Sequence, residues 1–221
     1  MPILQIENVT KHYQAQGQQV SALNGVSLSL HPGQFVALVG RSGCGKSTLL
    51  NLAGAMDFPS TGTVAIDGAV TTHLDDAQLT TLRRNKVGFI FQNFQLLPTL
   101  SVAENVELPL LLAGTANPRK AALETLSWVE LADYANRMPH QLSGGQIQRV
   151  AIARALVHKP KLLLADEPIG NLDTTTGNLI LDLLRRATQH FQTAILMATH
   201  SPDSTRVTDL TIEMRDGLIL A

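Results

Sequence analysis

The sequence predicts an α/β fold with a mostly parallel sheet, because short apolar runs alternate with stretches of helical periodicity. Each run is bounded by polar or turn-forming residues, as is typical of strands buried on both faces of a parallel sheet. The predicted strands are residues 35–39, 87–91, 161–165 and 194–198. Between them, apolar residues recur at helical spacing, which predicts helices at residues 46–56, 147–158 and 175–190.

Both ends of the chain carry patterns of antiparallel strands. Residues 3–9, 21–30 and 63–66 resemble short strands with little helix between them, so we expect an antiparallel β flank beside the parallel sheet. Further along, Asp216 and Gly217 separate the apolar segments 210–214 and 218–220, which predicts a tight hairpin.

From about residue 93 to residue 141 the pattern changes to helices. The predicted segments are residues 102–112 and 119–131, and we expect Pro98, Pro109, Pro118 and Pro139 to interrupt the helical pattern. We interpret this stretch as a helical insertion between two core strands.

The composition is that of one globular domain with a sizeable core. The chain has 221 residues, of which 44% are hydrophobic, and its 17 basic and 18 acidic residues give a net charge of −1. This balance lacks the surplus of positive charge that nucleic-acid or anionic-membrane binding requires. The single cysteine, Cys44, excludes an internal disulfide and fits a reducing compartment.

No apolar run approaches the roughly 18 residues of a membrane span, and the residues after Met1 do not resemble a secretory signal. We therefore expect a cytoplasmic protein. Any membrane-spanning part of its assembly would belong to another polypeptide.

Polar residues follow directly after each of the four predicted core strands. They are Gly40, Gln92, the pair Asp166 and Glu167, and His200. Because ligands bind outside the carboxyl ends of the strands in an open parallel sheet, we expect these residues to meet at one edge. Each also has an ordinary structural interpretation, since an acid can cap a helix and a histidine can be satisfied in the core.

Residues 40–48 match the phosphate-binding loop G-x-x-x-x-G-K-S/T, and they follow a predicted strand and open a predicted helix. Glycines let the backbone turn its N–H groups toward phosphate oxygens, and the helix N-terminus adds a favourable potential. Lys46 is expected to reach the terminal phosphates, and Ser47 to supply a hydroxyl ligand for Mg²⁺. The nucleotide-contacting residues expected in this loop are Gly40, Ser42, Gly43, Cys44, Gly45, Lys46, Ser47 and Thr48.

The acids after the third core strand indicate phosphoryl-transfer chemistry. Beside a phosphate loop, we expect Asp166 to hold Mg²⁺, mainly through water, and Glu167 to act as the catalytic base that polarises the attacking water. His200 could donate to the γ-phosphate. Gln92 has an amide that can ligate Mg²⁺ or the attacking water and report to the helical insertion. This set of residues predicts a P-loop ATPase that uses ATP and Mg²⁺.

Residues 142–146, Leu-Ser-Gly-Gly-Gln, precede the predicted helix at residues 147–158. Ser143, Gly144 and Gly145 form a polar, unhindered helix entrance that suits a phosphate. This segment resembles the signature of ABC transporter nucleotide-binding domains, and the resemblance covers nearly the whole chain. It implies one ABC ATPase domain over residues 1–221, with a P-loop NTPase (RecA-like) core and a helical signature subdomain at about residues 93–145.

The resemblance also implies further site residues and a partner. Two such domains pair head to tail, so that the signature segment of one closes over the γ-phosphate held by the loop of the other. Tyr13 matches the aromatic residue that stacks on adenine, although it could equally pack on the core. The remaining matches are Gln92 in the Q-loop, Asp166 and Glu167 in Walker B, Asp173 in the D-loop, His200 as the switch histidine, and Ser143, Gly144, Gly145 and Gln146 in the signature.

The resemblance implies the ATP-hydrolysing subunit of an ABC transporter. Its partners would be a second copy of itself or a homologous ATPase, and an integral-membrane permease on a separate chain that holds it at the cytoplasmic face of the inner membrane. Residues 82–98 and 104–109 look like the group of lipoprotein-releasing, macrolide-exporting and cell-division ATPases, which implies an exporter or a force-transmitting system. Phe94, Leu96 and Leu97 could form the groove for the partner's cytoplasmic helix or could pack in the core.

Two other classes of ABC-type protein remain open at the level of sequence. ATPases of chromosome maintenance or translation clamp nucleic acid, but they usually need a coiled coil or tandem ATPase domains and a basic surface, so no nucleic-acid partner is expected. A regulatory module could bind ATP with little hydrolysis, but Glu167 argues against it. Gln34, Ile169 and Ser201 replace the Glu, Thr and Asp common in the family, and none of these changes removes a predicted phosphate, Mg²⁺ or water contact.

Overall fold

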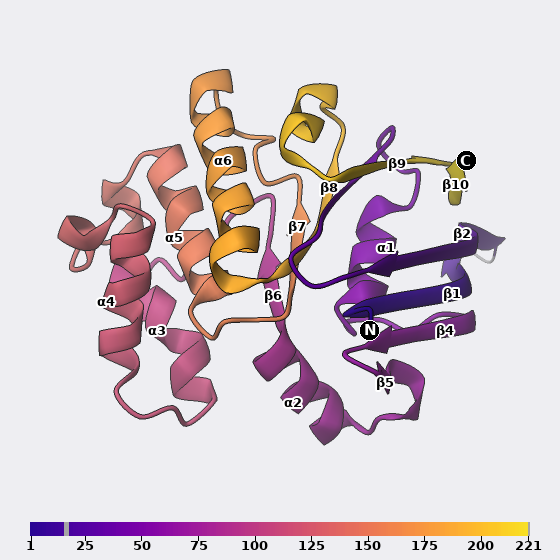
Figure 1. Cartoon of the computed structure of the whole chain (residues 1–221), viewed down its shortest axis with the longest axis horizontal. Helices are drawn as coiled ribbons and strands as arrows, with labels where there is room; N and C mark the ends of the chain where they lie inside the picture. Colours follow the sequence, from indigo (N-terminus) through magenta and orange to yellow (C-terminus); the bar gives the residue numbers. More distant parts are fainter. Residues whose placement is uncertain (16–17, 221) are drawn as a thin grey trace.

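The computed structural model describes residues 1–15 and 18–220. Within them the chain forms a six-stranded sheet, a four-stranded sheet and helices that cover both (Figure 1). The strand order is β10-β9-β3-β8-β7-β6 in the larger sheet and β2-β1-β4-β5 in the smaller one. None of the helices in this part of the chain is both long enough and apolar enough to span a bilayer.

The larger sheet contains all four predicted core strands as parallel neighbours. They are β3 (Phe35–Val39), β6 (Val87–Ile90), β7 (Leu162–Asp166) and β8 (Ala194–Thr199). Alternate residues of each strand pack into two different cores. In β7, Leu162 and Leu164 face one core, whereas Leu163 and Ala165 face the other. Burial on both faces explains why these strands are continuous apolar runs.

The predicted hairpin is formed by β9 (Leu210–Arg215) and β10 (Leu218–Leu220). Asp216 and Gly217 have φ angles of 50° and 78°, so both turn residues lie in the left-handed region that a tight primed turn requires. The sequence did not show that β9 also pairs in parallel with β3. The hairpin therefore extends the core sheet beside the strand that leads into the phosphate loop.

The antiparallel flank is present, and its strands are longer than predicted. It consists of β1 (Leu4–Ala15), β2 (Gln18–Leu30), β4 (Thr61–Ile66) and the short β5 (Ala69–Val70). The buried side chains of β1, β2 and β4 share one core with α1 (Lys46–Ala53), the helix that follows the phosphate loop. The flank thus covers one face of the larger sheet through α1.

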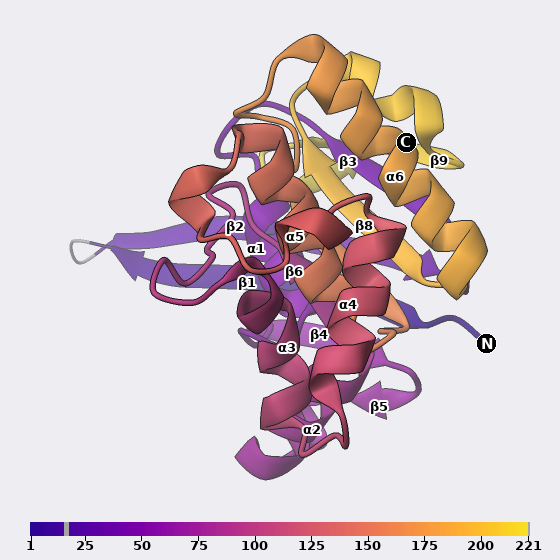
Figure 2. The same cartoon turned by 90° about the vertical axis from the view of Figure 1, so that its left-hand side faces the viewer.

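The helical insertion contains α3 (Val102–Leu112) and α4 (Pro118–Trp128) and leads into α5 (Gly144–Leu156), as Figure 2 shows from the side of these helices. Together with α6 (Thr174–Phe191) they pack on the second face of the larger sheet. The expectation that Pro109 interrupts the helical pattern was wrong, because it lies inside α3. Pro109 removes one backbone donor near the end of this short helix, while Ser101 and Glu104 form a capping box at its start.

α2 (Asp76–Lys86), a mostly exposed helix beside β6, was not predicted from the sequence. Its start carries a capping box between Asp75 and Gln78, and its last turn is basic, with Arg83 and Lys86. These local signals could have revealed the helix, whereas its weak apolar periodicity concealed it. The remaining helical turns are 3-10 helices at Thr71–His73, Ala132–Tyr134, Pro139–Gln141 and Pro202–Val207.

Candidate nucleotide-binding and catalytic site

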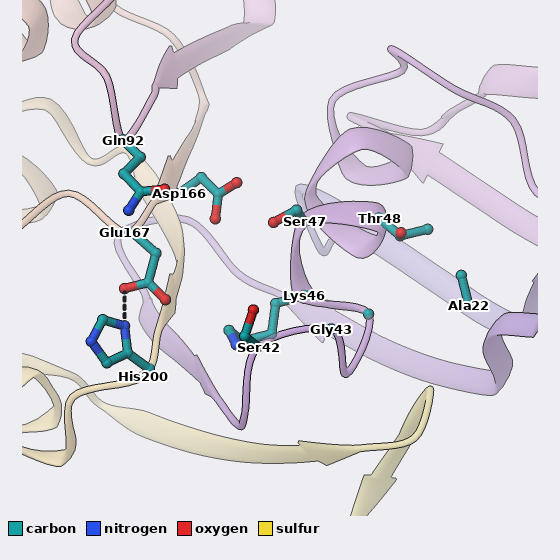
Figure 3. A pocket seen from close by; sticks show the side chains of 11 residues that line it. Ala22, Ser42, Gly43, Lys46, Ser47, Thr48, Gln92, Asp166, Glu167 and His200 are labelled. Atoms are coloured by element: carbon teal, nitrogen blue, oxygen red, sulfur yellow. Dashed lines mark hydrogen bonds and ion pairs between the residues drawn. The ribbon is translucent and has the colours of Figure 1, made fainter. Parts of the chain in front are cut away.

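A cavity of about 580 Å³ lies at the edge of the larger sheet where β6, β7 and β8 end (Figure 3). Residues from distant parts of the sequence line it. This agrees with the prediction that the polar residues that follow the core strands meet at one edge of the sheet. Its lining residues are Ala22, Ser42, Gly43, Gly45, Lys46, Ser47, Thr48, Gln92, Asp166, Glu167 and His200. Ala22, on β2, carried no chemical signal in the sequence.

The phosphate loop joins β3 to α1 and requires glycine at several places. Gly43 and Gly45 have φ angles of 80° and 105°, and a Cβ on Gly45 would lie 2.5 Å from the carbonyl oxygen of Ala22. The ammonium of the buried Lys46 donates to the carbonyl oxygens of Gly40 at 2.7 Å and Arg41 at 3.1 Å. The loop therefore wraps around the lysine, whose ammonium is held by two backbone carbonyl oxygens.

The structure places Gly40 and Cys44 behind the loop and not among the residues that line the cavity. A Cβ on Gly40 would lie 2.3 Å from the carbonyl oxygen of Met214 on β9. Cys44 is buried in the core, and its backbone carbonyl accepts a hydrogen bond of 3.1 Å from the N–H of Gly217 in the hairpin turn. These residues support the loop from the side of β9 and β10.

Asp166, at the end of β7, is half-buried and lies close to Ser47 and Lys46. The pKa of its carboxyl group is raised overall, mainly because the group is half-buried. The charge of the neighbouring Glu167 adds to the increase, whereas a hydrogen bond with Ser47 and the charge of Lys46 oppose it. The Ser47 hydroxyl, the Asp166 carboxylate and the Gln92 amide all face one cavity. Hard oxygen donors of this kind are the ligands that Mg²⁺ prefers, so the residues present fit that ion.

Glu167 and His200 form a hydrogen-bonded pair at the same end of the cavity. The Nδ1 atom of His200 lies 2.9 Å from Oε2 of Glu167 (Figure 3). Glu167 has a φ angle of 47°, and its N–H donates to the carbonyl oxygen of Ala198 on β8 at 3.0 Å. Such a left-handed backbone is unfavourable for a non-glycine residue and is often found at functional sites. The arrangement holds one oxygen of Glu167 on the histidine.

The segment after Glu167 is tied to two other parts of the predicted site. Nδ2 of Asn171 donates to the backbone carbonyl of Gln92 at 3.1 Å. Nε2 of Gln148, a fully buried residue of α5, donates to the carbonyl oxygen of Pro168 at 2.7 Å. The resemblance to the family places Asn171 in the D-loop with Asp173, but neither of these two hydrogen bonds was predicted, because a hydrogen bond to backbone leaves no motif.

The signature residues lie away from this cavity. Ser143 is the N-cap of α5, and it forms a capping box in which the side-chain oxygen of Gln146 accepts from the N–H of Ser143 at 2.9 Å. Ser143, Gly145 and Gln146 line a different cavity of about 220 Å³, whose wall includes Thr176 of α6. Gly144 opens α5 and faces Leu172. Within one chain the structure does not bring the signature to the phosphate loop.

Asp173 also lies outside the main cavity. It is the N-cap of α6, and its carboxylate accepts a hydrogen bond of 3.0 Å from the N–H of Thr176. It lines a cavity of about 180 Å³ that is also lined by Glu167 and His200.

Tyr13 lies on β1, and 39% of its surface is exposed. It neither packs in one of the two cores nor lines the main cavity, so core packing does not account for it. Its hydroxyl donates to Oδ2 of Asp57 at 2.9 Å.

An apolar groove of about 440 Å³ lies between α2, β6, α3 and α5. The candidate residues Phe94, Leu96 and Leu97 do not line this groove. Leu96 packs against the core on the second face of the larger sheet, as the alternative interpretation expected, whereas Leu97 is 43% exposed. Arg154 of α5 holds the loop after β6 by donating to the backbone carbonyl oxygens of Phe94 and Gln95. The lining residues are Thr80, Arg83, Arg84, Val87, Gly88, Phe89, Phe91, Gln95, Leu108, Pro109, Leu112, Arg154, Ala155 and His158.

Residues 23–170 match the protein family described as ABC transporter. The uncharacterized ABC transporter ATP-binding protein MJ0796 of Methanocaldococcus jannaschii is 45% identical over 97% of this chain and 94% of its own length. A dimeric structure of the MJ0796 cassette aligns with a TM-score of 0.91 at 43% identity, covering 99% of this chain and 97% of that one.

A second structure of MJ0796, described as a dimeric post-hydrolysis state bound to ADP and Pi, has a TM-score of 0.89 at 43% identity and the same coverage of both chains. The macrolide export ATP-binding/permease protein MacB of Syntrophobacter fumaroxidans is 42% identical over 99% of this chain but only 31% of its own length.

The family match covers most of the chain, and MJ0796 shares both its length and its fold. The predicted family, the predicted ABC ATPase fold and the predicted ATPase class are therefore confirmed. The chain belongs to the ABC transporter family, as one of its ATP-binding and ATP-hydrolysing cassettes.

Proposed function

We propose that this cassette works as a head-to-tail dimer and uses ATP hydrolysis to drive an integral-membrane permease on a separate chain. One observation carries the proposal. Lys46, Asp166 and Glu167 line one cavity, whereas Ser143 and Gly145 of the same chain line another. A site that needs both sets of residues must draw them from two chains.

The residues of the main cavity divide into groups with different chemistry. The Lys46 ammonium and the backbone N–H groups at the start of α1 bind the phosphates and stabilise the charge that develops on them. Ser47, Asp166 and Gln92 are the residues that would hold Mg²⁺, which when bound neutralises charge on the phosphate oxygens.

Glu167 orients a water molecule for attack on the γ-phosphorus. The new bond forms between the water oxygen and phosphorus, and the bond from phosphorus to the oxygen of the ADP leaving group breaks. The water proton passes to the Glu167 carboxylate. His200 fixes one oxygen of that carboxylate at 2.9 Å and so leaves the other oxygen to bind water.

A second subunit would supply the remaining groups. Ser143 and the N-terminus of α5 from the partner would close over the γ-phosphate, where a helix N-terminus binds anions well. Asp173 would lie at the junction of the subunits. The dimeric structures of MJ0796, one of them bound to ADP and Pi, support this arrangement.

The apolar groove between α2 and α3 is our candidate for the site that receives the permease. A short amphipathic helix would lay its apolar face on Phe89, Leu108 and Leu112, while Arg83 and Arg84 would pair with acidic groups at its ends. The similarity to MacB, an ATP-binding/permease protein for macrolide export, supports an exporter or a force-transmitting system. In this proposal the permease holds the cassette at the cytoplasmic face of the inner membrane.

Glu167→Gln tests the catalytic part of the proposal. The variant should bind ATP but lose at least about a hundredfold in turnover, because an amide cannot accept the water proton. Since hydrolysis opens the dimer, ATP should trap the variant as a dimer in size-exclusion chromatography. Lys46→Ala is the control, because it should abolish ATP binding and therefore the trapped dimer. Near-normal hydrolysis by the Glu167→Gln variant would exclude the role given to Glu167.

A further inference from the structure

Lys11, Tyr13 and Asp57 form a hydrogen-bonded cluster next to the main cavity but outside it. Lys11 and Tyr13 belong to β1, and Asp57 lies in the loop after α1. In Figure 3, Thr48 and Ala22 lie at the end of the cavity opposite to Glu167 and His200. Tyr13 interacts with the side chain of Thr48, so the cluster adjoins this second end.

The Asp57 carboxylate uses its two oxygens for different partners. Oδ1 accepts hydrogen bonds from Nζ of Lys11 at 2.6 Å and from the N–H of Phe58 at 2.7 Å, and Oδ2 accepts from the Tyr13 hydroxyl at 2.9 Å. Burial alone raises the pKa of Asp57, but the bonds from Lys11, Phe58 and Tyr13 lower it overall, so the group stays ionised. The carboxylate is therefore a fixed acceptor for Tyr13.

The Tyr13 ring is restrained at two places. Its hydroxyl is bound to Asp57, and Nζ of Lys11 lies 4.9 Å from its centroid. Lys11 is itself held, because it also donates to the carbonyl oxygen of Phe58 at 2.7 Å. The ring is 39% exposed and belongs to neither hydrophobic core, so we take these polar contacts to set its orientation.

We propose that Asp57, together with Lys11, is a positioning residue that holds the Tyr13 ring as a preformed platform for the base of the bound nucleotide. This inference rests on the proposed function, in which the loop at residues 40–48 binds the triphosphate. With the γ-phosphate beside Glu167, the ribose and base must leave the cavity at the end formed by Thr48 and Ala22. A ring already held there loses less conformational entropy when the base stacks on it.

Tyr13→Phe separates this proposal from simple stacking, because it keeps the ring and removes only the hydroxyl that Asp57 binds. We expect ATP affinity to fall about three- to tenfold, the cost of immobilising one free side chain. Asp57→Ala should lower it by a similar factor. For both variants KM for ATP should rise while kcat at saturating ATP stays unchanged, since neither residue contacts the γ-phosphate or the water.

Tripolyphosphate is the control ligand, because it carries the phosphates of ATP without a base. Its affinity, measured with Mg²⁺ by calorimetry, should be the same for the wild type, Tyr13→Phe and Asp57→Ala. Asp67→Ala is the matched control for loss of an ion-paired acid, since Asp67 pairs with Lys161 and has a side chain 26% exposed, against 30% for Asp57. It should leave the affinity for both ligands unchanged.

A double-mutant cycle completes the test. In a Tyr13→Ala background, Asp57→Ala should have no further effect on ATP affinity, because the platform is already absent. Unchanged ATP affinity in Tyr13→Phe, or an equal loss for ATP and tripolyphosphate in either variant, would overturn the proposal. If the wild-type chain binds tripolyphosphate but not ATP, or neither ligand, then the proposed function itself fails.

Discussion

Gly145 packs directly against Thr176, so the start of α5 touches the first turn of α6. A Cβ on Gly145 would lie 2.3 Å from Cγ2 of Thr176, far inside contact distance. The preceding glycine is different, because a Cβ on Gly144 would meet only Leu172, at 3.5 Å. Replacing glycine by alanine in a helix normally stabilises it by about 1 kcal/mol. Only at Gly145 does the packing oppose this gain.

We therefore predict opposite effects for two neighbouring substitutions. Gly145→Ala should lower the free energy of unfolding by about 1–3 kcal/mol, because the stiff β-branched side chain of Thr176 must move, whereas Gly144→Ala should be neutral or stabilising. Adding Thr176→Ser to Gly145→Ala removes the clashing methyl group and should restore most of the loss. Urea unfolding of the wild type and these three variants measures the free energy of unfolding. Equal stability of the two single alanine variants would contradict the contact.

At the scale of single residues, motifs predicted every residue that lines the main cavity except Ala22, because the phosphate loop and the paired acids have fixed local spacing. They did not predict Asp57. It meets Lys11 across 46 positions of sequence, and that contact exists only because β1 and the loop after α1 are brought together by the fold. The hydrogen bonds of Gln148 and Asn171 were not predicted for a related reason, since both side chains bind backbone carbonyls and not functional side chains.

At the scale of elements, the groove between α2 and α3 makes the clearest prediction. Leu112 lines the groove and is 64% exposed, whereas the adjacent Leu111 is 55% exposed and does not line it. Leu112→Glu should leave folding and ATP hydrolysis by the isolated cassette unchanged but reduce recovery of a membrane protein with the cassette from detergent extracts, because burial of an unpaired carboxylate is costly.

Leu111→Glu is the matched control and should retain the membrane partner. Loss of the partner with both variants, or with neither, would place the docking site elsewhere. Recovery of ribosomes or DNA-associated proteins in place of a membrane protein would favour the nucleic-acid class of ABC proteins.

Periodicity predicted the elements that are buried, and it failed for those that are not. The core strands and α5 were found because burial on both faces or on one stripe leaves an apolar pattern. α2 was missed because most of its surface is exposed, so only its capping box and basic last turn indicate it. The pairing of β9 with β3 could not be predicted, since strand order depends on tertiary contacts and not on the hairpin's own sequence.

At the scale of the whole molecule, the separation of Lys46 from Ser143 predicts complementation between inactive subunits. A chain with Lys46→Ala keeps its signature, and a chain with Ser143→Arg keeps its phosphate loop. Each variant alone should hydrolyse ATP poorly. An equimolar mixture should exceed the sum of the two, because a mixed dimer contains one site with both an intact loop and an intact signature.

The control mixture pairs Lys46→Ala with a chain that carries both substitutions. It offers no complete site, so its ATPase activity should stay at the level of the separate proteins. Failure of the first mixture to exceed this control would mean that one chain supplies every group of its own site or that a single intact site cannot turn over.

The hairpin of β9 and β10 has a consequence for synthesis of the chain on the ribosome. The phosphate loop is synthesised early, but its supports come from the end of the chain. The N–H of Gly217 donates to the backbone carbonyl of Cys44, and Gly40 packs on Met214. The side chain of Asn24 on β2 donates to the carbonyl oxygen of Asp216. A nascent chain that ends before residue 210 lacks β9 beside β3 and every one of these supports. Competence to bind ATP should therefore arise only after residues 210–220 have left the exit tunnel, so nucleotide cannot stabilise an incomplete cassette and acts as a ligand of the finished domain alone.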